Sequence, residues 1–418
     1  MERRTTHAAL RRDLQRVLPH HRIQGTRDRG RGIIVRPEKP GELQQIIRIA
    51  WDAEVPVLPM GLSHKAVQLE ELHLRLDLEG LSRILEYDAS SGLVTVQSGV
   101  TLKGLADWLS SKKKIFPVHC MGNDGIQLWE FLSQPWAGGY GPATGHKLDQ
   151  VVALSALLPD GEEITSTISP RRAVGPDPSR LLLSGEGRFA LLTRATLRVV
   201  DAPVRVARLV FGGPHMARHL DTFWALSEAT RPTEIRIMGR RRSLTEGEEG
   251  PWYTVLWNLW GEGRDLVRRK ELVIKAMTPA FSALHLRNPY ELEGTCPLAG
   301  AEGVYAEYTA QRRDLPTFCR RLSDALAGGQ IEAFRIFGFL NGAVSVGARC
   351  GPGDAGGALP SWVDGLAEGL RGVHPGVGPP GTRELQDALA EALDPRGTFS
   401  LVHRLWSGVV GAGARGTE

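Results

Sequence analysis

Three histidines and a small set of arginines are the side chains of this sequence best suited to proton transfer and anion binding. An imidazole titrates near neutral pH, so His64, His119 and His146 are candidate bases for removing a hydroxyl proton. A guanidinium group can bind a carboxylate, and the candidates for this role are Arg240, Arg241, Arg242 and Arg335, with Tyr305 and Tyr308 as further donors. A base and a cation together could act on a substrate that carries a hydroxyl and a carboxylate group, although each residue also has common structural roles.

Other kinds of chemistry find little support in the sequence. We see no Ser-His-Asp spacing, no phosphate-binding Walker loop and no paired-carboxylate motif. The four cysteines have neither metal-type nor redox-type spacing, so we expect buried thiols in a reducing compartment: Cys120, Cys296, Cys319 and Cys350. The sequence therefore predicts no metal site.

The overall charge and hydropathy restrict the partners. A net charge of +4 over 418 residues is too small for a protein whose main ligand is nucleic acid. No apolar stretch is long enough to span a bilayer, and residues 1–31 lack the apolar core of a secretory signal. We expect a cytoplasmic protein that binds a small molecule and is not integral to a membrane.

The elements that would position these residues begin with a β-α-β unit. A strand is expected at Gly32–Val35, a helix from Pro40 with apolar residues at helical spacing, and a second strand at Val55–Pro59. Such units bind ligands just after their strands, which puts the loop around His64 in a ligand-binding position. Further strands are expected at the following segments: Leu72–Leu78, Ser82–Tyr87, Leu93–Gln97, Asp149–Leu158 and a closing pair within Phe189–Val200. A helix carrying Leu102, Leu105 and Leu109 completes this part.

Asp201-Ala202-Pro203 is the expected boundary between two domains. We assign residues 1–29 to an N-terminal lead, 30–202 to a first domain and 203–418 to a second. After the boundary, two β-α-β-like rounds predict a ferredoxin-like α/β domain, closed by a helix at Arg383–Leu393. The fold class is therefore α+β.

Several segments, in their order and spacing, resemble the FAD-binding domain of FAD-linked oxidases. They are Leu74–Asp88, Leu93–Leu102, Leu157–Glu162, Gly175–Leu182, Gly185–Leu197 and Ala392–Phe399. The family is the vanillyl-alcohol oxidase / para-cresol methylhydroxylase (PCMH-type) superfamily, with glycolate oxidase FAD subunits and D-lactate dehydrogenases as the nearest relatives. The resemblance implies a PCMH-type domain of two α+β subdomains holding FAD, followed by a substrate or cap domain.

The same resemblance implies which residues contact FAD. They are Met60, Gly61, Leu62, Ser63, His64, Lys65, Gly125, Gly138, Gly139, Gly145, Asp149, Glu186, Gly187 and Leu192. In some branches of the family, a histidine at the position of His64 is bonded to the flavin. His64 is therefore also a candidate for a covalent link to FAD.

This sequence departs from the family at three places. The family's phosphate loop contains three glycines followed by Thr-Ser, whereas only Gly61 remains here. A second family contact is a Gly-Gly pair, which Trp129 and Glu130 replace; side chains of that size would fill space near the flavin or displace the loop. The metal- and substrate-binding segment of hydroxy-acid enzymes corresponds to Gly338–Val346, which has no histidine or aspartate.

Two functions therefore compete. The first is an FAD-dependent oxidoreductase that transfers a hydride from a small alcohol or 2-hydroxy acid to flavin. The alternative is a non-catalytic or flavin-free protein on the same fold, which pairs with a true flavoenzyme or an iron–sulfur subunit. The degenerate flavin motifs motivate the alternative.

Overall fold

The computed structural model describes most of the chain and divides it into two units. The described residues are 6–26, 31–61, 71–118, 125–133, 143, 145, 147–168, 178–184, 187–214, 216, 219–242, 249–279, 281–283, 305–340, 343–350, 366, 368–370, 373–375 and 382–400. Unit 1 comprises Met1–Ala137, Leu148–Asp201 and Gly381–Trp406, and unit 2 comprises Gly138–Lys147, Ala202–Pro380 and Ser407–Glu418. Each unit is described by itself.

Unit 1 begins with a small, mainly parallel sheet. Its strands lie in the order β1 (Ile23–Gly25), β2 (Gly32–Val35), β4 (His73–Leu76), β3 (Val57–Pro59), and only β1 is antiparallel to its neighbour. Helices α1 (His7–Leu14) and α2 (Pro40–Ala53) bury their apolar faces in the same core as these strands. Because β2, β3 and β4 run parallel, their carboxyl ends meet at one edge, and Gly61 follows β3 at that edge.

A second sheet of unit 1 is antiparallel. Its order is β5 (Ile84–Asp88), β6 (Leu93–Gln97), β10 (Leu191–Arg198), β8 (Val151–Leu157), β9 (Glu163–Thr165). Helices α3 (Leu102–Ser111), α4 (Leu128–Ser133) and α5 (Pro178–Ser184) belong to the same unit, and β7 (Lys114–Ile115) pairs with β11 (Val200–Asp201). Both sheets contribute to one continuous hydrophobic core.

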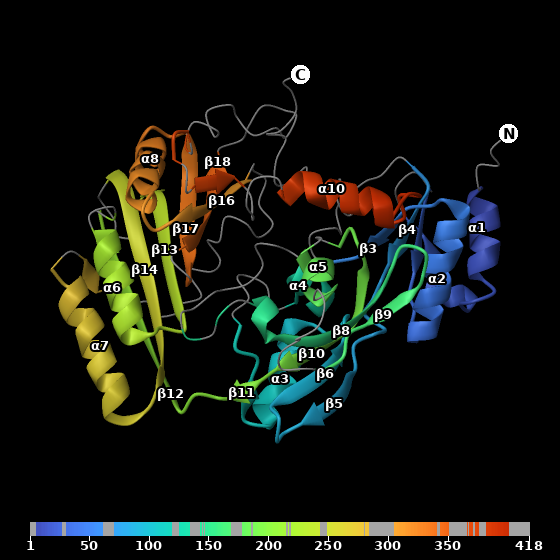
Figure 1. The fold of residues 1–418 in the computed structure, drawn as a ribbon, viewed down its shortest axis with the longest axis horizontal. Coiled ribbons are helices and arrows are strands. Elements are labelled where there is room, and N and C mark those ends of the chain that lie inside the picture. Colours follow the sequence, from blue (N-terminus) through green and yellow to red (C-terminus); the bar gives the residue numbers. More distant parts are fainter. Residues whose placement is uncertain are drawn as a thin grey trace. The chain divides into compact units, whose positions relative to one another are not determined.

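The last described helix, α10 (Thr382–Leu393), also packs on unit 1, as Figure 1 shows. Beyond it, the backbone N–H of Val57 donates to the carbonyl of Thr398 (2.6 Å), and the Arg396 guanidinium lies 4.8 Å from the ring centre of Trp51. The sequence analysis assigned all of residues 203–418 to the second domain. In the structure, Gly381–Trp406 belongs to unit 1 instead, and Phe399 is buried in the core of that unit.

Unit 2 is built on one eight-stranded antiparallel sheet. Its order is β15 (Ser282–Ala283), β12 (Arg205–Gly213), β14 (Glu249–Gly261), β13 (Glu234–Arg242), β17 (Ile331–Leu340), β18 (Ala343–Cys350), β16 (Tyr305–Gln311), β19 (Val373–Pro375). Helices α6 (Leu220–Thr230), α7 (Gly263–Met277) and α8 (Leu315–Ala327) cover one face (Figure 1). The predicted α+β class, with two β-α-β rounds in the second half, is confirmed.

Strand alternation gives this sheet two different faces. Ile235, Ile237 and Val255 point into the core beneath the helices. On the opposite face, a smaller buried cluster contains Val210, Met238 and Leu256. Because side chains alternate along β13, the charged residues Glu234, Arg236 and Arg240 share the face of Met238. The face without helices is therefore the polar face of unit 2.

Two sequence predictions differ in detail from the structure. The closing pair expected within Phe189–Val200 is a single strand, β10, followed by the two-residue β11, which pairs with β7 rather than with β10. The strand around Leu74 does alternate in hydrophobicity, but His73 and Arg75 are buried as well. This is the pattern of an interior strand of a parallel sheet, which is covered on both faces.

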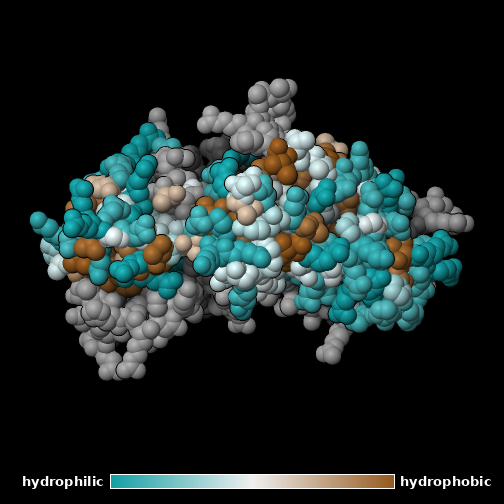
Figure 2. Space-filling view, turned by 90° about the horizontal axis from the view of Figure 1, so that it is seen from below, coloured by the Kyte–Doolittle hydropathy of each residue, from teal (hydrophilic) through white to brown (hydrophobic). Residues whose placement is uncertain are grey.

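The surface of the described residues is mainly hydrophilic, with separate hydrophobic patches (Figure 2). Exposed apolar side chains include Val267, Leu272 and Ile274 of α7. Scattered apolar residues are normal on the surface of a folded protein. Among the described residues, no helix is both long and apolar enough to cross a membrane.

Candidate functional site: a glycine loop and a cationic sheet face

The loop after β3 is the first candidate binding element. Met60 donates its backbone N–H to the carbonyl of Leu76 (2.7 Å), which fixes the start of the loop against β4. Gly61 follows and is buried. A glycine leaves its backbone open to close approach, and backbone N–H groups that can be approached in this way can bind an anionic group.

The side chain of Glu130 lies against this glycine. A methyl group built onto Gly61 would overlap the Glu130 carboxylate, whose carbon and two oxygens are the three nearest atoms. Glu130 belongs to α4 and is 0% exposed. The space over Gly61 is thus filled by a carboxylate from another part of unit 1.

Helix α4 is held firmly in this position. The backbone N–H groups of Leu128 and Trp129 donate to the carbonyls of Val100 (2.8 Å) and Ser98 (2.9 Å). Trp129 Nε1 donates to Gln127 Oε1 (2.8 Å), and every residue of the helix is buried. The two residues that replace the family's Gly-Gly pair are therefore part of the packed interior.

The other predicted FAD contacts are only partly described. Gly145 and Gly187 have φ values of 74° and 77°, which favour glycine, and Asp149 pairs with Arg180 (2.8 Å). Leu192 lies in β10 opposite Ala156, and Gly125 precedes α4. The remaining predicted residues lie outside the described residues: Leu62, Ser63, His64, Lys65, His119, Gly138, Gly139, His146 and Glu186.

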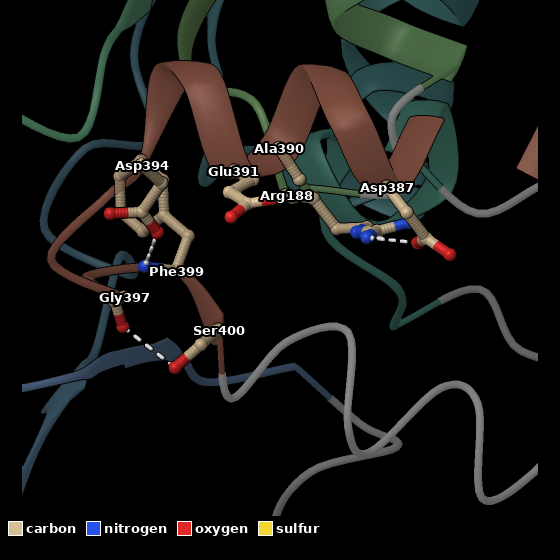
Figure 3. Close-up of a pocket in the computed structure, with 8 residues that line it drawn as sticks. All are labelled: Arg188, Asp387, Ala390, Glu391, Asp394, Gly397, Phe399 and Ser400. Atoms are coloured by element: carbon tan, nitrogen blue, oxygen red, sulfur yellow. Dashed lines mark hydrogen bonds and ion pairs between the residues drawn. The ribbon is translucent and has the colours of Figure 1, made fainter. Parts of the chain in front are cut away.

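A cavity of about 230 Å³ lies beside α10 in unit 1 (Figure 3). It is lined by Arg188, Asp387, Ala390, Glu391, Asp394, Gly397, Phe399 and Ser400. Arg188 pairs with Asp387 (Nη2–Oδ1 2.6 Å). This ion pair at the cavity wall connects the segment after Gly187 to α10 near the C-terminus. The sequence analysis noted both segments but did not predict their contact.

Asp394 closes the other end of this cavity. Its carboxylate accepts hydrogen bonds from the backbone N–H groups of Thr398 and Phe399, each 2.7 Å long. Burial raises the pKa of Asp394, although these hydrogen bonds act in the opposite direction. The carboxylate holds a turn of the chain, which is a structural role.

The polar face of unit 2 is the second candidate element. Arg240 on β13 lies opposite Trp252 on β14, so the two side chains are neighbours on one face. Among the described residues, neither Arg240 Nη2 nor Trp252 Nε1 has a hydrogen-bond partner, although both atoms are buried. Burial lowers the pKa of Arg240, but a guanidinium stays protonated at neutral pH. Two buried donors are thus directed at no acceptor in the described part of the chain.

Deeper along the same face, a charged network is largely satisfied. Glu234 pairs with Arg236 and accepts a hydrogen bond from Asn258 Nδ2 (2.6 Å). The Arg236 side chain is only 3% exposed, so Glu234 compensates a charge that is fully removed from water. Because Glu234 is bonded to Arg236 and Asn258, we assign this network a structural role beside Arg240 and not a role in ligand binding.

Of the predicted carboxylate-binding residues, the structure describes the side chain of Arg240 alone. Arg241 and Arg242 end β13, Arg335 lies in β17 opposite Met238, and Tyr305 and Tyr308 lie in β16; the side chains of these residues are outside the described part. Trp252 was missed, because its position beside Arg240 depends on the register of β13 and β14.

Comparison with known proteins agrees with this architecture. Residues 32–167 match the model of the family described as FAD binding domain. A D-lactate dehydrogenase of Archaeoglobus fulgidus is 27% identical over 52% of this chain and 49% of its own length. A cytochrome-type mitochondrial D-lactate dehydrogenase of Arabidopsis thaliana is 24% identical over 41% of this chain and 30% of its own length.

A solved structure of alkyldihydroxyacetonephosphate synthase superimposes with a TM-score of 0.71 at 14% identity, over 95% of this chain and 86% of that one. This likeness shows the fold. The chain matches less than half the length of the two dehydrogenases.

The fold and the matched family model define an FAD-binding domain of the PCMH type, followed by an α/β domain. Through residues 32–167 the chain is similar to the FAD-linked oxidases of the vanillyl-alcohol oxidase / para-cresol methylhydroxylase superfamily, whose fold it shares.

The described residues fit FAD binding in their scaffold and differ at one contact. Gly61, Gly145 and Gly187 supply backbone that only glycine allows to be approached closely or to take positive φ. The carboxylate of Glu130, however, lies where the open face of Gly61 would receive an anionic group.

Proposed function

We propose that this protein is an FAD-dependent oxidoreductase that oxidises the CH–OH group of a small 2-hydroxy acid, whose carboxylate is bound by Arg240. The observation that carries the proposal is the pair of buried donors without partners, Arg240 Nη2 and Trp252 Nε1. A carboxylate is an acceptor-only group with two oxygens, so it complements two donors on neighbouring side chains. The relatives named as D-lactate dehydrogenases support a 2-hydroxy acid.

Each residue has a defined task in this proposal. Bound FAD supplies the hydride acceptor. Arg240 contributes a charge-assisted hydrogen bond, which is stronger because the guanidinium is withdrawn from water. Trp252 contributes a second donor, which fixes the orientation of the carboxylate. The base that takes the hydroxyl proton is one of the predicted histidines, His64, His119 or His146.

The first test is the visible spectrum of the purified protein. We expect flavin bands near about 375 and about 450 nm, as for bound FAD. Bleaching of the band at longer wavelength by D-lactate, glycolate or D-2-hydroxyglutarate under anaerobic conditions would identify the substrate. A protein that is colourless and fails to take up added FAD would contradict the proposal.

The Arg240→Met substitution tests the substrate contact. Loss of a hydrogen bond to a charged group costs about 1.5–3 kcal/mol, so kcat/KM for the acid should fall about 10- to 150-fold. The matched control is Arg205→Met, which removes an exposed arginine from β12 and should change kcat/KM less than twofold. An equal effect of both substitutions would show that Arg240 does not bind the substrate.

A second candidate function is a flavin-free or non-catalytic subunit that pairs with a true flavoenzyme or an iron–sulfur protein. The observation that favours it is the Glu130 carboxylate against Gly61. Co-purification of a flavoprotein or iron–sulfur partner with a colourless chain would support this candidate. We place either form of the protein in the cytoplasm.

The predicted covalent link through His64 needs its own measurement. We expect an increase in intact mass equal to FAD after acid denaturation if the link exists, and yellow colour in the acid pellet. An unmodified mass from a yellow protein would show that FAD is held without a covalent bond.

A further inference from the structure

Glu130 is a buried acid that has no task in the chemistry above. It is 0% exposed, and its carboxylate covers the one glycine that remains in the loop after β3. Both Gly61 and Glu130 belong to unit 1, so this contact lies within one compact body.

Electrostatics makes this position significant. Peptide N–H groups that follow the carboxyl end of a parallel strand can bind anions. The anionic part of FAD is its pyrophosphate, which carries negative charge at neutral pH. A carboxylate and a phosphate therefore disfavour one another at the same glycine.

The backbone of the helix that carries Glu130 is anchored in unit 1. Its first residues are anchored by backbone hydrogen bonds from Leu128 to Val100 and from Trp129 to Ser98. Phe131 and Leu132, the two residues after Glu130, are buried in the core of unit 1. A ligand that needs the space over Gly61 must therefore displace the end of the Glu130 side chain, while the backbone of α4 stays in place.

We propose that Glu130 is an internal anion that occupies the anion position at Gly61 and thereby sets the affinity of this chain for phosphate-bearing flavins. The inference rests on the proposed FAD function and deepens it, because it names the residue that decides how tightly FAD is held. The consequence is a weaker FAD complex than the fold alone would give.

The test compares flavin affinity in neutral variants of the full chain. Glu130→Gln keeps the size of the side chain and removes its charge. The dissociation constant for FAD, measured on flavin-free protein by quenching of flavin fluorescence, should fall at least about tenfold, which corresponds to about 1.4 kcal/mol. Riboflavin, which has the ring but no phosphate, should bind wild type and variant with dissociation constants within about twofold of each other.

Two further variants control this result. Glu163→Gln removes an exposed carboxylate of β9 and should leave FAD affinity unchanged. Glu130→Met is a second neutral side chain of similar length, used if the glutamine variant does not fold as judged by thermal unfolding.

The outcomes separate this inference from the function on which it rests. If wild type and Glu130→Gln bind FAD equally, the inference is overturned and FAD binding stands. If riboflavin gains as much affinity as FAD, Glu130 acts by bulk near the ring and not by charge, which also overturns it. If neither wild type nor any folded Glu130 variant binds FAD, both the inference and the proposed function fail.

Discussion

Each unit contains a partly buried arginine, and the two differ in whether the guanidinium has a hydrogen-bond partner among the described residues. In unit 1, Arg22 donates to both carboxylate oxygens of Glu42 (2.8 and 3.1 Å), and the side chains are 12% and 14% exposed. The carboxylate also accepts from the backbone N–H of Glu38 and Lys39. In unit 2, Arg240 Nη2 and Trp252 Nε1 have no partner among the described residues.

This difference separates scaffold from binding surface. Buried polar groups are normally hydrogen-bonded, so an exception needs an explanation, such as a ligand that supplies the missing acceptor. The pair in unit 1 joins the segment before β1 to the start of α2, which is a structural task. Glu130 differs from both arginines, because its carboxylate lies against Gly61, a glycine at which an external anion could otherwise bind.

Glu234→Ala should have the largest effect on stability of the substitutions that probe this comparison. Arg236 would remain almost fully buried without its carboxylate, and breaking a buried pair in this way costs about 3–5 kcal/mol. We expect this loss in the unfolding free energy from urea denaturation followed by tryptophan fluorescence.

The control is Glu228→Ala, which breaks an exposed pair with Arg312 in the same unit. Its cost should be no more than about 1 kcal/mol, because exposed ion pairs contribute little. Equal costs for the two substitutions would show that Arg236 does not depend on Glu234, and that unit 2 tolerates uncompensated buried charge in general.

Much of the fold could be predicted from the sequence because its elements have clear local patterns. The apolar spacing of Leu43, Ile46 and Ile47 predicted α2, and the segment Leu93–Gln97 coincides with β6. The packing of residues 382–400 on unit 1 could not be predicted in this way. It depends on long-range contacts such as the hydrogen bond from Val57 to Thr398, which leave no periodic signal.

The candidate site was less accessible to sequence reasoning. The replacement of a Gly-Gly pair by Trp129 and Glu130 was visible, but the meeting of Glu130 with Gly61 requires the folded chain. Likewise, Arg240 was selected by residue type, whereas Trp252 is its neighbour only through a strand pairing that includes a register shift between Arg240 and Arg242.

Glu42→Gln tests the arginine of unit 1 that has its hydrogen-bond partner, Arg22. Gln cannot accept both hydrogen bonds from Arg22, so we expect a loss of about 1.5–3 kcal/mol at neutral pH. Burial acts to raise the pKa of Glu42, but Arg22 and the backbone N–H groups outweigh it and hold this pKa below 4.5. The stabilisation is therefore present above pH 4.5 and is lost as the pH falls through the lowered pKa.

Urea denaturation of wild type and Glu42→Gln at several pH values checks this prediction. The difference in unfolding free energy should shrink towards zero as the pH falls below 4.5. A difference that does not change with pH would mean that the ionised pair contributes nothing beyond packing.

Asp394→Asn should have the smallest effect and the opposite pH dependence. Asn has one carbonyl oxygen, whereas Asp394 accepts from Thr398 and Phe399 through separate oxygens, so one hydrogen bond is lost at a cost of about 0.5–1.5 kcal/mol.

Burial raises the pKa of Asp394 above its ordinary 3.8, so the folded state holds this proton to a higher pH than the unfolded state does. The wild type should therefore lose stability as the pH rises from 3.8 through the raised pKa, and this slope should be absent from Asp394→Asn. The two carboxylates of unit 1 would then show opposite slopes in the same denaturation series. A gain in stability of the wild type relative to Asp394→Asn over that range would contradict this prediction. It would mean that the backbone hydrogen bonds outweigh burial at Asp394, as hydrogen bonds do at Glu42.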